Sequence, residues 1–121
     1  MKKHILTIDD EREIRELLRE VLNAAGYRVT AVSSALEAME VVRTDPPHLV
    51  ITDLQLEEND GFDLADQVKV IAPQTPIILL TGVLFDPEVL SGPVGDKIAA
   101  YVEKTAPLER ILREVKRLVP S

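Results

Sequence analysis

Five polar residues stand where they could act together, at or just beyond the ends of short apolar runs: Asp9, Asp10, Asp53, Thr81 and Lys104. Three carboxylates in one cleft would repel one another, and a hard dication is the natural way to neutralise them. Mg²⁺ prefers oxygen ligands and typically takes one or two carboxylates plus a phosphate. A threonine hydroxyl and a lysine ammonium would suit phosphate oxygens. If these residues converge, the pattern indicates a site for magnesium and a phosphoryl group.

Each of these residues also has a purely structural explanation. Asp53 could be a turn residue, and Asp10 with Glu13 fits a capping box at the start of a helix. Thr81 precedes a glycine, as in an ordinary turn, and a lone Lys104 would be a solvated surface charge. The coincidence at the ends of four apolar runs favours a common site, because the structural explanations would have to produce it independently.

The elements that must position these residues are short strands alternating with amphipathic helices. The run that ends at Asp53 is apolar and β-branched after Pro46-Pro47, which is typical of a strand buried on both faces of a parallel sheet. The expected strands are residues 4–8, 27–32, 48–53, 76–80 and 99–103. The expected helices are residues 11–25, a helix capped by Ser33 or Ser34, residues 62–71, a short helix from Asp86, and a last helix between Pro107 and Pro120.

This alternation predicts the α/β class, with a doubly wound five-stranded parallel sheet between two layers of helices. The matching arrangement is the flavodoxin-like (βα)5 three-layer sandwich with strand order 2-1-3-4-5. In that order the first and third strands are neighbours at the switch point. We therefore expect Asp9, Asp10 and Asp53 to converge at the carboxyl edge of the sheet.

Composition limits the class of protein. A length of 121 residues, 45% of them apolar, fits one domain over residues 1–121. No apolar run approaches a membrane span, and the N-terminus leads into a strand rather than a signal sequence, which predicts a cytoplasmic protein without membrane association. The absence of cysteine excludes disulfides and thiolate chemistry. A net charge of -7 argues against direct binding of nucleic acid by this domain.

Together the motifs resemble the receiver domain of bacterial two-component response regulators, and the resemblance covers essentially the whole chain. In that family an acidic pair, a central aspartate, a Thr or Ser and a Lys form the signature, which here falls on Asp9 and Asp10, Asp53, Thr81 and Lys104. Gly61 matches the glycine eight residues beyond the phosphoacceptor, and Tyr101 matches the aromatic residue three before the lysine.

The resemblance implies a phosphoacceptor signalling switch. Asp53 would accept a phosphoryl group from a histidine kinase or a histidine phosphotransfer protein. Mg²⁺, or Mn²⁺, would be held by Asp10, Asp53 and the backbone carbonyl of Gln55, with Asp9 assisting. The domain would catalyse only its own phosphorylation and dephosphorylation, so it would not be an enzyme in the usual sense.

The resemblance also implies how the signal leaves the domain. Thr81 and Lys104 would engage the phosphoryl group, and Tyr101 would rotate inward, although half-buried packing also explains an aromatic residue there. An unknown downstream protein or a fused output domain would read the change. Phosphorylation could also drive formation of a homodimer.

Three features depart from the family pattern. Thr105 stands where proline usually follows the lysine, and Glu57 stands where the loop commonly has proline. The helix that begins at Asp86 is interrupted by Gly92-Pro93, so we expect residues 86–98 to be the least stable part of the fold.

Other functions stay open. One alternative is a receiver-like protein-interaction domain that acts mainly without phosphorylation. A phospho-aspartate hydrolase is less favoured, because such enzymes usually carry a second acid where Gln55 stands. A flavin-binding module is weaker still, because Asp9-Asp10-Glu11 is no cradle for phosphate.

Overall fold

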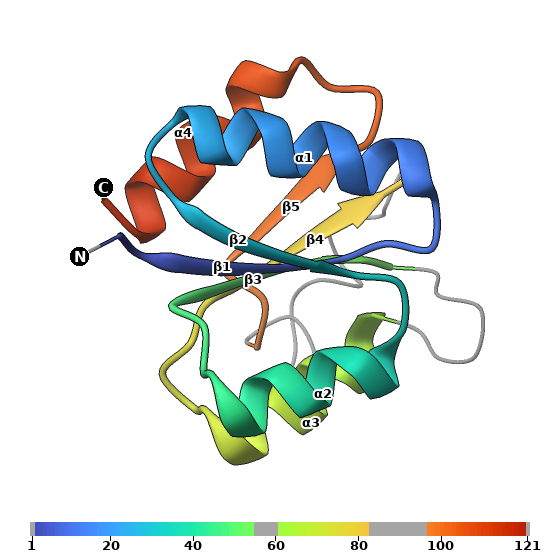
Figure 1. Cartoon of the computed structure of the whole chain (residues 1–121). Coiled ribbons are helices and arrows are strands. Elements are labelled where there is room, and N and C mark those ends of the chain that lie inside the picture. Colours follow the sequence, from blue (N-terminus) through green and yellow to red (C-terminus); the bar gives the residue numbers. More distant parts are fainter. Residues whose placement is uncertain (1, 55–60, 83–96, 121) are drawn as a thin grey trace.

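The computed structural model describes residues 2–54, 61–82 and 97–120 (Figure 1). The strands in these ranges are β1 (His4–Ile8), β2 (Arg28–Val32), β3 (Leu49–Asp53), β4 (Ile77–Thr81) and β5 (Ala100–Glu103). The helices are α1 (Arg12–Ala24), α2 (Ala35–Thr44), α3 (Gly61–Ile71) and α4 (Leu108–Leu118). No helix within the described ranges is long and apolar enough to cross a membrane.

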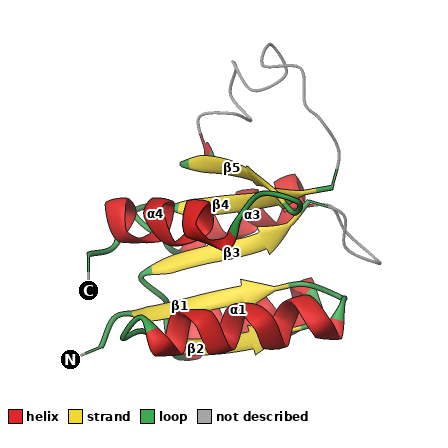
Figure 2. Cartoon of the chain, turned by 90° about the horizontal axis from the view of Figure 1, so that it is seen from above, coloured by secondary structure: helices red, strands yellow, loops and turns green. Residues whose placement is uncertain are grey.

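The strands form one parallel sheet in the order β2-β1-β3-β4-β5. Helices α1 and α4 cover one face, and α2 and α3 cover the other (Figure 1). The view from above shows the strands side by side between these layers (Figure 2). The predicted doubly wound, flavodoxin-like α/β fold is confirmed. The expected helix from Asp86, and nearly all of the segment 86–98 expected to be least stable, lie outside the described residues.

The core lies on both faces of the sheet because successive strand residues point to opposite sides. Leu6 of β1 belongs to the cluster beneath α2 and α3, whereas its neighbour Ile5 belongs to the cluster beneath α1 and α4. Every residue of β1, β3 and β4 is buried. The edge strands β2 and β5 are only partly covered. The continuous apolar runs in the sequence therefore mark the three central strands.

The helix ends follow the sequence with one correction. Gly26, just after α1, has a φ of 99°, which is the left-handed conformation expected of it. The Oγ of Ser34 accepts a hydrogen bond from the backbone N–H of Glu37 and so caps α2. The capping box proposed for Asp10 and Glu13 is wrong: the N-cap of α1 is Glu11, and no side chain caps this helix.

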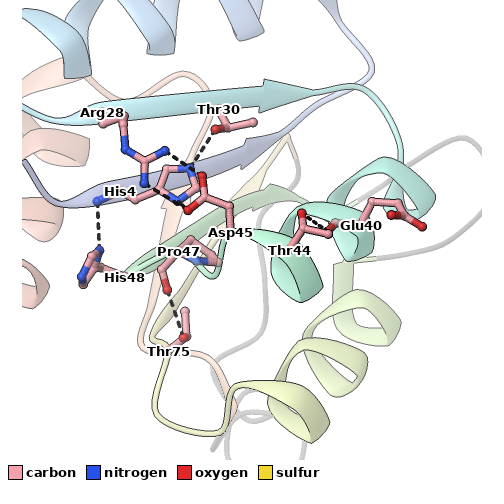
Figure 3. A network of polar contacts seen from close by, with 9 residues as sticks. All are labelled: His4, Arg28, Thr30, Glu40, Thr44, Asp45, Pro47, His48 and Thr75. Atoms are coloured by element: carbon pink, nitrogen blue, oxygen red, sulfur yellow. Dashed lines mark hydrogen bonds and ion pairs between the residues drawn. The ribbon is translucent and has the colours of Figure 1, made fainter.

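A polar network ties the amino edge of the sheet together (Figure 3). The backbone N–H of the completely buried His4 donates to Nδ1 of His48 at 3.0 Å, and its ring Nε2 lies 2.7 Å from Oγ1 of Thr30. Beside them, Arg28 makes a two-pronged ion pair with Asp45. The network joins β1 and β2 to the segment that leads from α2 into β3.

Because His4 is buried, we expect the free energy of unfolding to fall in mild acid. Burial lowers the pKa of the His4 imidazole below its ordinary 6.5, and the charge of Arg28 lowers it further, although Asp45 opposes both. Below about pH 6.5 the unfolded chain therefore binds a proton that the native state refuses. The contribution of His4 to stability is complete above this pH and is lost as the pH falls toward the native pKa.

The measurement is urea unfolding of the wild type and of His4→Gln between pH 8 and pH 5, taken as the difference in unfolding free energy. Glutamine keeps polar atoms but does not titrate. We expect the stability advantage of the wild type to shrink as the pH falls. Parallel curves for the two proteins would show that His4 does not titrate differently in the native state.

Candidate functional site

Four acidic residues meet at the carboxyl edge of the sheet. Asp9, Asp10, Glu11 and Asp53 each offer one carboxylate oxygen, and these oxygens all lie within 4.8 Å of one another. Asp9 and Asp53 are buried, whereas Asp10 and Glu11 are exposed. The predicted convergence of the acidic pair with Asp53 is confirmed.

Strand register places these acids. Ile8 of β1 pairs with Thr52 of β3, so the residue that follows each of them reaches the same edge of the sheet. The backbone N–H of Asp9 then donates to the carbonyl of Val32 at the end of β2, 3.2 Å away. Its Oδ1 accepts from the backbone N–H of Glu11 at 2.9 Å. The turn between β1 and α1 is thereby fixed with the Asp9 side chain pointing inward.

Lys104 reaches into the acidic cluster from the end of β5. Its Nζ donates to Oδ2 of Asp53 at 2.9 Å and lies 3.2 Å from both Oδ2 of Asp9 and Oε1 of Glu11. Its backbone N–H donates to the carbonyl of Thr81 at 2.8 Å, which fixes where the side chain begins. Only 16% of the side chain is exposed. The interpretation of Lys104 as an exposed surface charge is therefore wrong, because three carboxylates surround it.

Burial and the neighbouring charges shift the pKa values of Asp9 and Lys104. Burial raises the pKa of the Asp9 carboxyl, and the neighbouring Asp53 adds to the rise, while the Glu11 N–H and Lys104 oppose it. Burial alone would lower the pKa of Lys104, but its hydrogen bond to Asp53 and the charge of Asp9 raise it above its usual value. Four acids face one ammonium among the described residues of this cluster, so negative charge is in excess.

This donor set fits a hard divalent cation. Carboxylate oxygens are the ligands that Mg²⁺ prefers, and Asp9, Asp10 and Asp53 can all direct oxygens toward one point. An ion there would also compensate the excess negative charge. Gln55, whose backbone carbonyl was expected as a further ligand, lies outside the described residues, as does Glu57.

Gly61 is required by close packing behind the site. A Cβ at this position would stand 2.6 Å from Cδ2 of Leu79 and 2.7 Å from the backbone oxygen of Asp53. Real Cβ atoms essentially never approach other heavy atoms so closely. The Gly61 N–H also donates to the carbonyl of Leu54. The absence of a side chain thus lets α3 begin directly against the end of the strand that carries Asp53.

Thr81 and Tyr101 lie on the strands beside the acidic cluster. Thr81 is the last residue of β4 and is buried, with its carbonyl engaged by Lys104. Tyr101 of β5 is half-buried and packs against the apolar cluster beneath α2 and α3. Burial raises the pKa of its phenol. Residues at the ends of β1, β3, β4 and β5 therefore lie at the carboxyl edge of the sheet, as the sequence indicates.

Sequence reasoning missed two residues here. The apolar spacing of the helix expected over residues 11–25 places Glu11 and Arg15 on its polar face, but Glu11 contacts Lys104, and Arg15 donates from its guanidinium to the carbonyl of Asp9 at 2.8 Å. The only signal for Glu11 was its place directly after the acidic pair. Helical periodicity cannot distinguish a side chain that faces water from one that turns back over the helix start.

The fold and the site define a class. A parallel sheet in this order, with acids at its switch point and a lysine at the same edge, is a doubly wound α/β domain whose donor set suits a divalent cation. The family model for the response regulator receiver domain matches residues 5–116, and the chain therefore belongs to this family.

Curated relatives agree with this membership. Sporulation initiation phosphotransferase F of Bacillus subtilis is 35% identical over 81 residues, which are 67% of this chain and 65% of that protein. Response regulator MprA of Mycobacterium leprae is 30% identical over 122 residues, which are 95% of this chain and 50% of that protein. The chain thus spans less than two thirds of the first of these relatives and half of the second.

Solved structures agree as well. The non-phosphorylated HemR receiver domain from Leptospira biflexa is 30% identical with a TM-score of 0.86, over 99% of this chain and 96% of that one. Response regulator TrrA from Thermotoga maritima, solved in complex with Mg²⁺-BeF, is also 30% identical, with a TM-score of 0.85 over 98% of this chain and all of that one. Their likeness extends over nearly the entire fold.

Proposed function

We propose that this receiver domain is the phosphoacceptor switch of a two-component system or phosphorelay, and that Asp53 accepts the phosphoryl group. The observation that carries the proposal is the position of Asp53: its carboxylate is buried at the switch point, 2.9 Å from the ammonium of Lys104, among three other acids. A nucleophile, a phosphate-binding cation and a set of magnesium ligands are thereby combined at one place.

The chemistry is phosphoryl transfer to a carboxylate. An Asp53 oxygen attacks phosphorus as the bond from phosphorus to the donor breaks, and the leaving group keeps the electron pair of that bond. The reaction needs in-line positioning and charge neutralisation more than covalent machinery. Mg²⁺, or Mn²⁺, held by Asp9, Asp10 and Asp53 would supply neutralisation of the phosphoryl oxygens when bound. The domain would thus catalyse only its own phosphorylation and dephosphorylation.

The output would come from the added negative charge on Asp53. The phosphoryl oxygens would engage the ammonium of Lys104 and the hydroxyl of Thr81, and these residues end β5 and β4. Tyr101 lies on β5 three residues before Lys104, so a shift of this strand would change its packing. A downstream protein, a fused output domain or a second copy of the chain would read the altered surface.

Membership of the receiver family supports a histidine kinase or a histidine phosphotransfer protein as the phosphoryl donor. Sporulation initiation phosphotransferase F and response regulator MprA, which are relatives of this chain, are consistent with such a donor. We also propose a cytoplasmic location, where such a donor and Mg²⁺ would be accessible. The net charge of -7 leaves nucleic-acid binding to another protein or domain.

The experiment that tests the function is intact mass measurement after incubation with acetyl phosphate and Mg²⁺. We expect the protein to gain the mass of one phosphoryl group, and to gain none when a chelator is in excess, because the uncompensated carboxylates would repel the donor. An unchanged mass with Mg²⁺ present would contradict the proposal and favour a receiver-like interaction domain. Equal labelling in excess chelator would contradict the metal assignment.

A further inference from the structure

The geometry points to Glu11 as a positioning residue that holds Lys104 in the unphosphorylated protein and competes with the phosphoryl group for it. The inference rests on the proposed phosphoacceptor function. Glu11 would set how readily the site accepts a phosphoryl group, although it is neither the nucleophile nor one of the expected metal ligands.

Lys104 can donate only a limited number of hydrogen bonds. An ammonium has three N–H donors. Its Nζ has three carboxylate partners within 3.2 Å, on Asp9, Glu11 and Asp53. Two of these donors make hydrogen bonds to Asp53 and Glu11, whereas Oδ2 of Asp9 is an ion-pair partner at 3.2 Å without hydrogen-bond geometry. A phosphoryl oxygen that approaches Nζ must compete for it with the carboxylates that already surround it.

The three partners differ in how easily they can leave. Asp9 and Asp53 are buried, and without Lys104 each would be an uncompensated charge away from water. The side chain of Glu11 is 62% exposed, so water can replace its contact with Lys104 at little cost. Glu11 is therefore the partner that a phosphoryl group would displace.

The position of Glu11 is nevertheless well defined. Its backbone N–H is fixed by Oδ1 of Asp9, and the residue is the N-cap of α1 with an extended backbone. Its side chain makes no capping hydrogen bond. The carboxylate is directed across the helix start to Lys104 instead. The residue thus links the turn after β1 to the end of β5 in the absence of a phosphoryl group.

The consequence is a measurable restraint on phosphorylation. An exposed ion pair of this kind contributes little free energy, which corresponds to an effect of about two- to fivefold on a competing equilibrium. Removing the Glu11 charge should therefore tighten binding of a phosphoryl analogue by about this factor. Magnesium affinity should change by less than a factor of about two, because Glu11 competes for Lys104 rather than for the metal.

The test compares Glu11→Gln with Glu13→Gln, an identical charge change at an exposed residue two positions further along α1. Titration calorimetry measures Mg²⁺ binding first, and then binding of beryllofluoride in saturating Mg²⁺. We expect tighter beryllofluoride binding for Glu11→Gln alone. Equal gains in both variants, no gain in either, or a marked loss of magnesium affinity in Glu11→Gln would overturn the inference.

A second comparison separates competition for Lys104 from simple repulsion of the anion. The rate of labelling by acetyl phosphate is measured for both glutamine substitutions in a Lys104→Met background, where in-line attack by Asp53 remains. Without the ammonium to hold, the two substitutions should have equal effects, and a larger effect of Glu11→Gln there would overturn the inference.

The outcomes for the wild type distinguish this inference from the proposed function. If the wild type neither binds beryllofluoride nor is labelled, the phosphoacceptor function fails. If it does both while Glu11→Gln behaves like Glu13→Gln, only the role of Glu11 fails.

Discussion

Replacing Asp53 with asparagine is expected to abolish labelling by acetyl phosphate in the presence of Mg²⁺. The amide has nearly the shape of the carboxylate but lacks its nucleophilic charge, so attack on phosphorus is lost. The other acids of the cluster remain in place, and none of them should take the label instead, because Asp53 alone ends the buried strand between β1 and β4. Intact mass measurement is the assay.

The matched control is Asp63→Asn, which makes the same change at an exposed acid in the first turn of α3. This variant should be labelled like the wild type. Asp53→Asn should remain folded by circular dichroism, because removing one of four neighbouring acids relieves repulsion while Lys104 keeps two carboxylate partners. Labelling of folded Asp53→Asn at the wild-type level would refute Asp53 as the phosphoacceptor.

Replacing Gly61 with alanine should produce a large loss of stability. The added methyl group would approach Leu79 and the backbone oxygen of Asp53 to within 2.7 Å, and backbone cannot move aside as a flexible side chain does. Overpacking of this kind typically costs about 1–3 kcal/mol, and a clash against backbone belongs at or above the upper end. The measurement is urea unfolding at neutral pH, with the midpoint and the slope both recorded.

Gly82→Ala is the control, because a Cβ at Gly82 would meet nothing within 4 Å. It should change the free energy of unfolding by less than about 0.5 kcal/mol. Gly61→Ala should also slow labelling of Asp53, since the start of α3 presses on the end of β3. If Gly61→Ala is as stable as Gly82→Ala, the close approach between α3 and β3 does not constrain the fold.

The fold was predictable because its three central strands are buried on both faces. Their apolar runs are continuous, and the runs at His4 and His48 predicted β1 and β3 within one residue at each end. The convergence of Asp9, Asp10 and Asp53 followed from strand order, since parallel strands bring their carboxyl ends to one edge. Family resemblance then supplied the roles of Thr81 and Lys104, which remain proposals.

What the sequence could not predict depends on side-chain direction and on contacts between distant elements. The capping box at Asp10 failed because the chain enters α1 one residue later, and Asp9 accepts the bond from the turn instead. The three contacts of Lys104 depend on the path of its flexible side chain. His4 contacts Thr30, which is 26 positions away in the sequence, and His48, which is 44 positions away. No local sequence pattern indicates such distant partners.

The length of β1 separates two charged regions of the molecule. This strand has five residues, with His4 at its start and Asp9 directly after its end, so about 16 Å lie between the histidine network and the acids. Substitutions at sites more than about 7–10 Å apart that share no partners usually have additive effects on stability. Changes at the two ends should therefore be additive. Stability can thus be adjusted at His4 to study folding while the chemistry at Asp53 is left undisturbed.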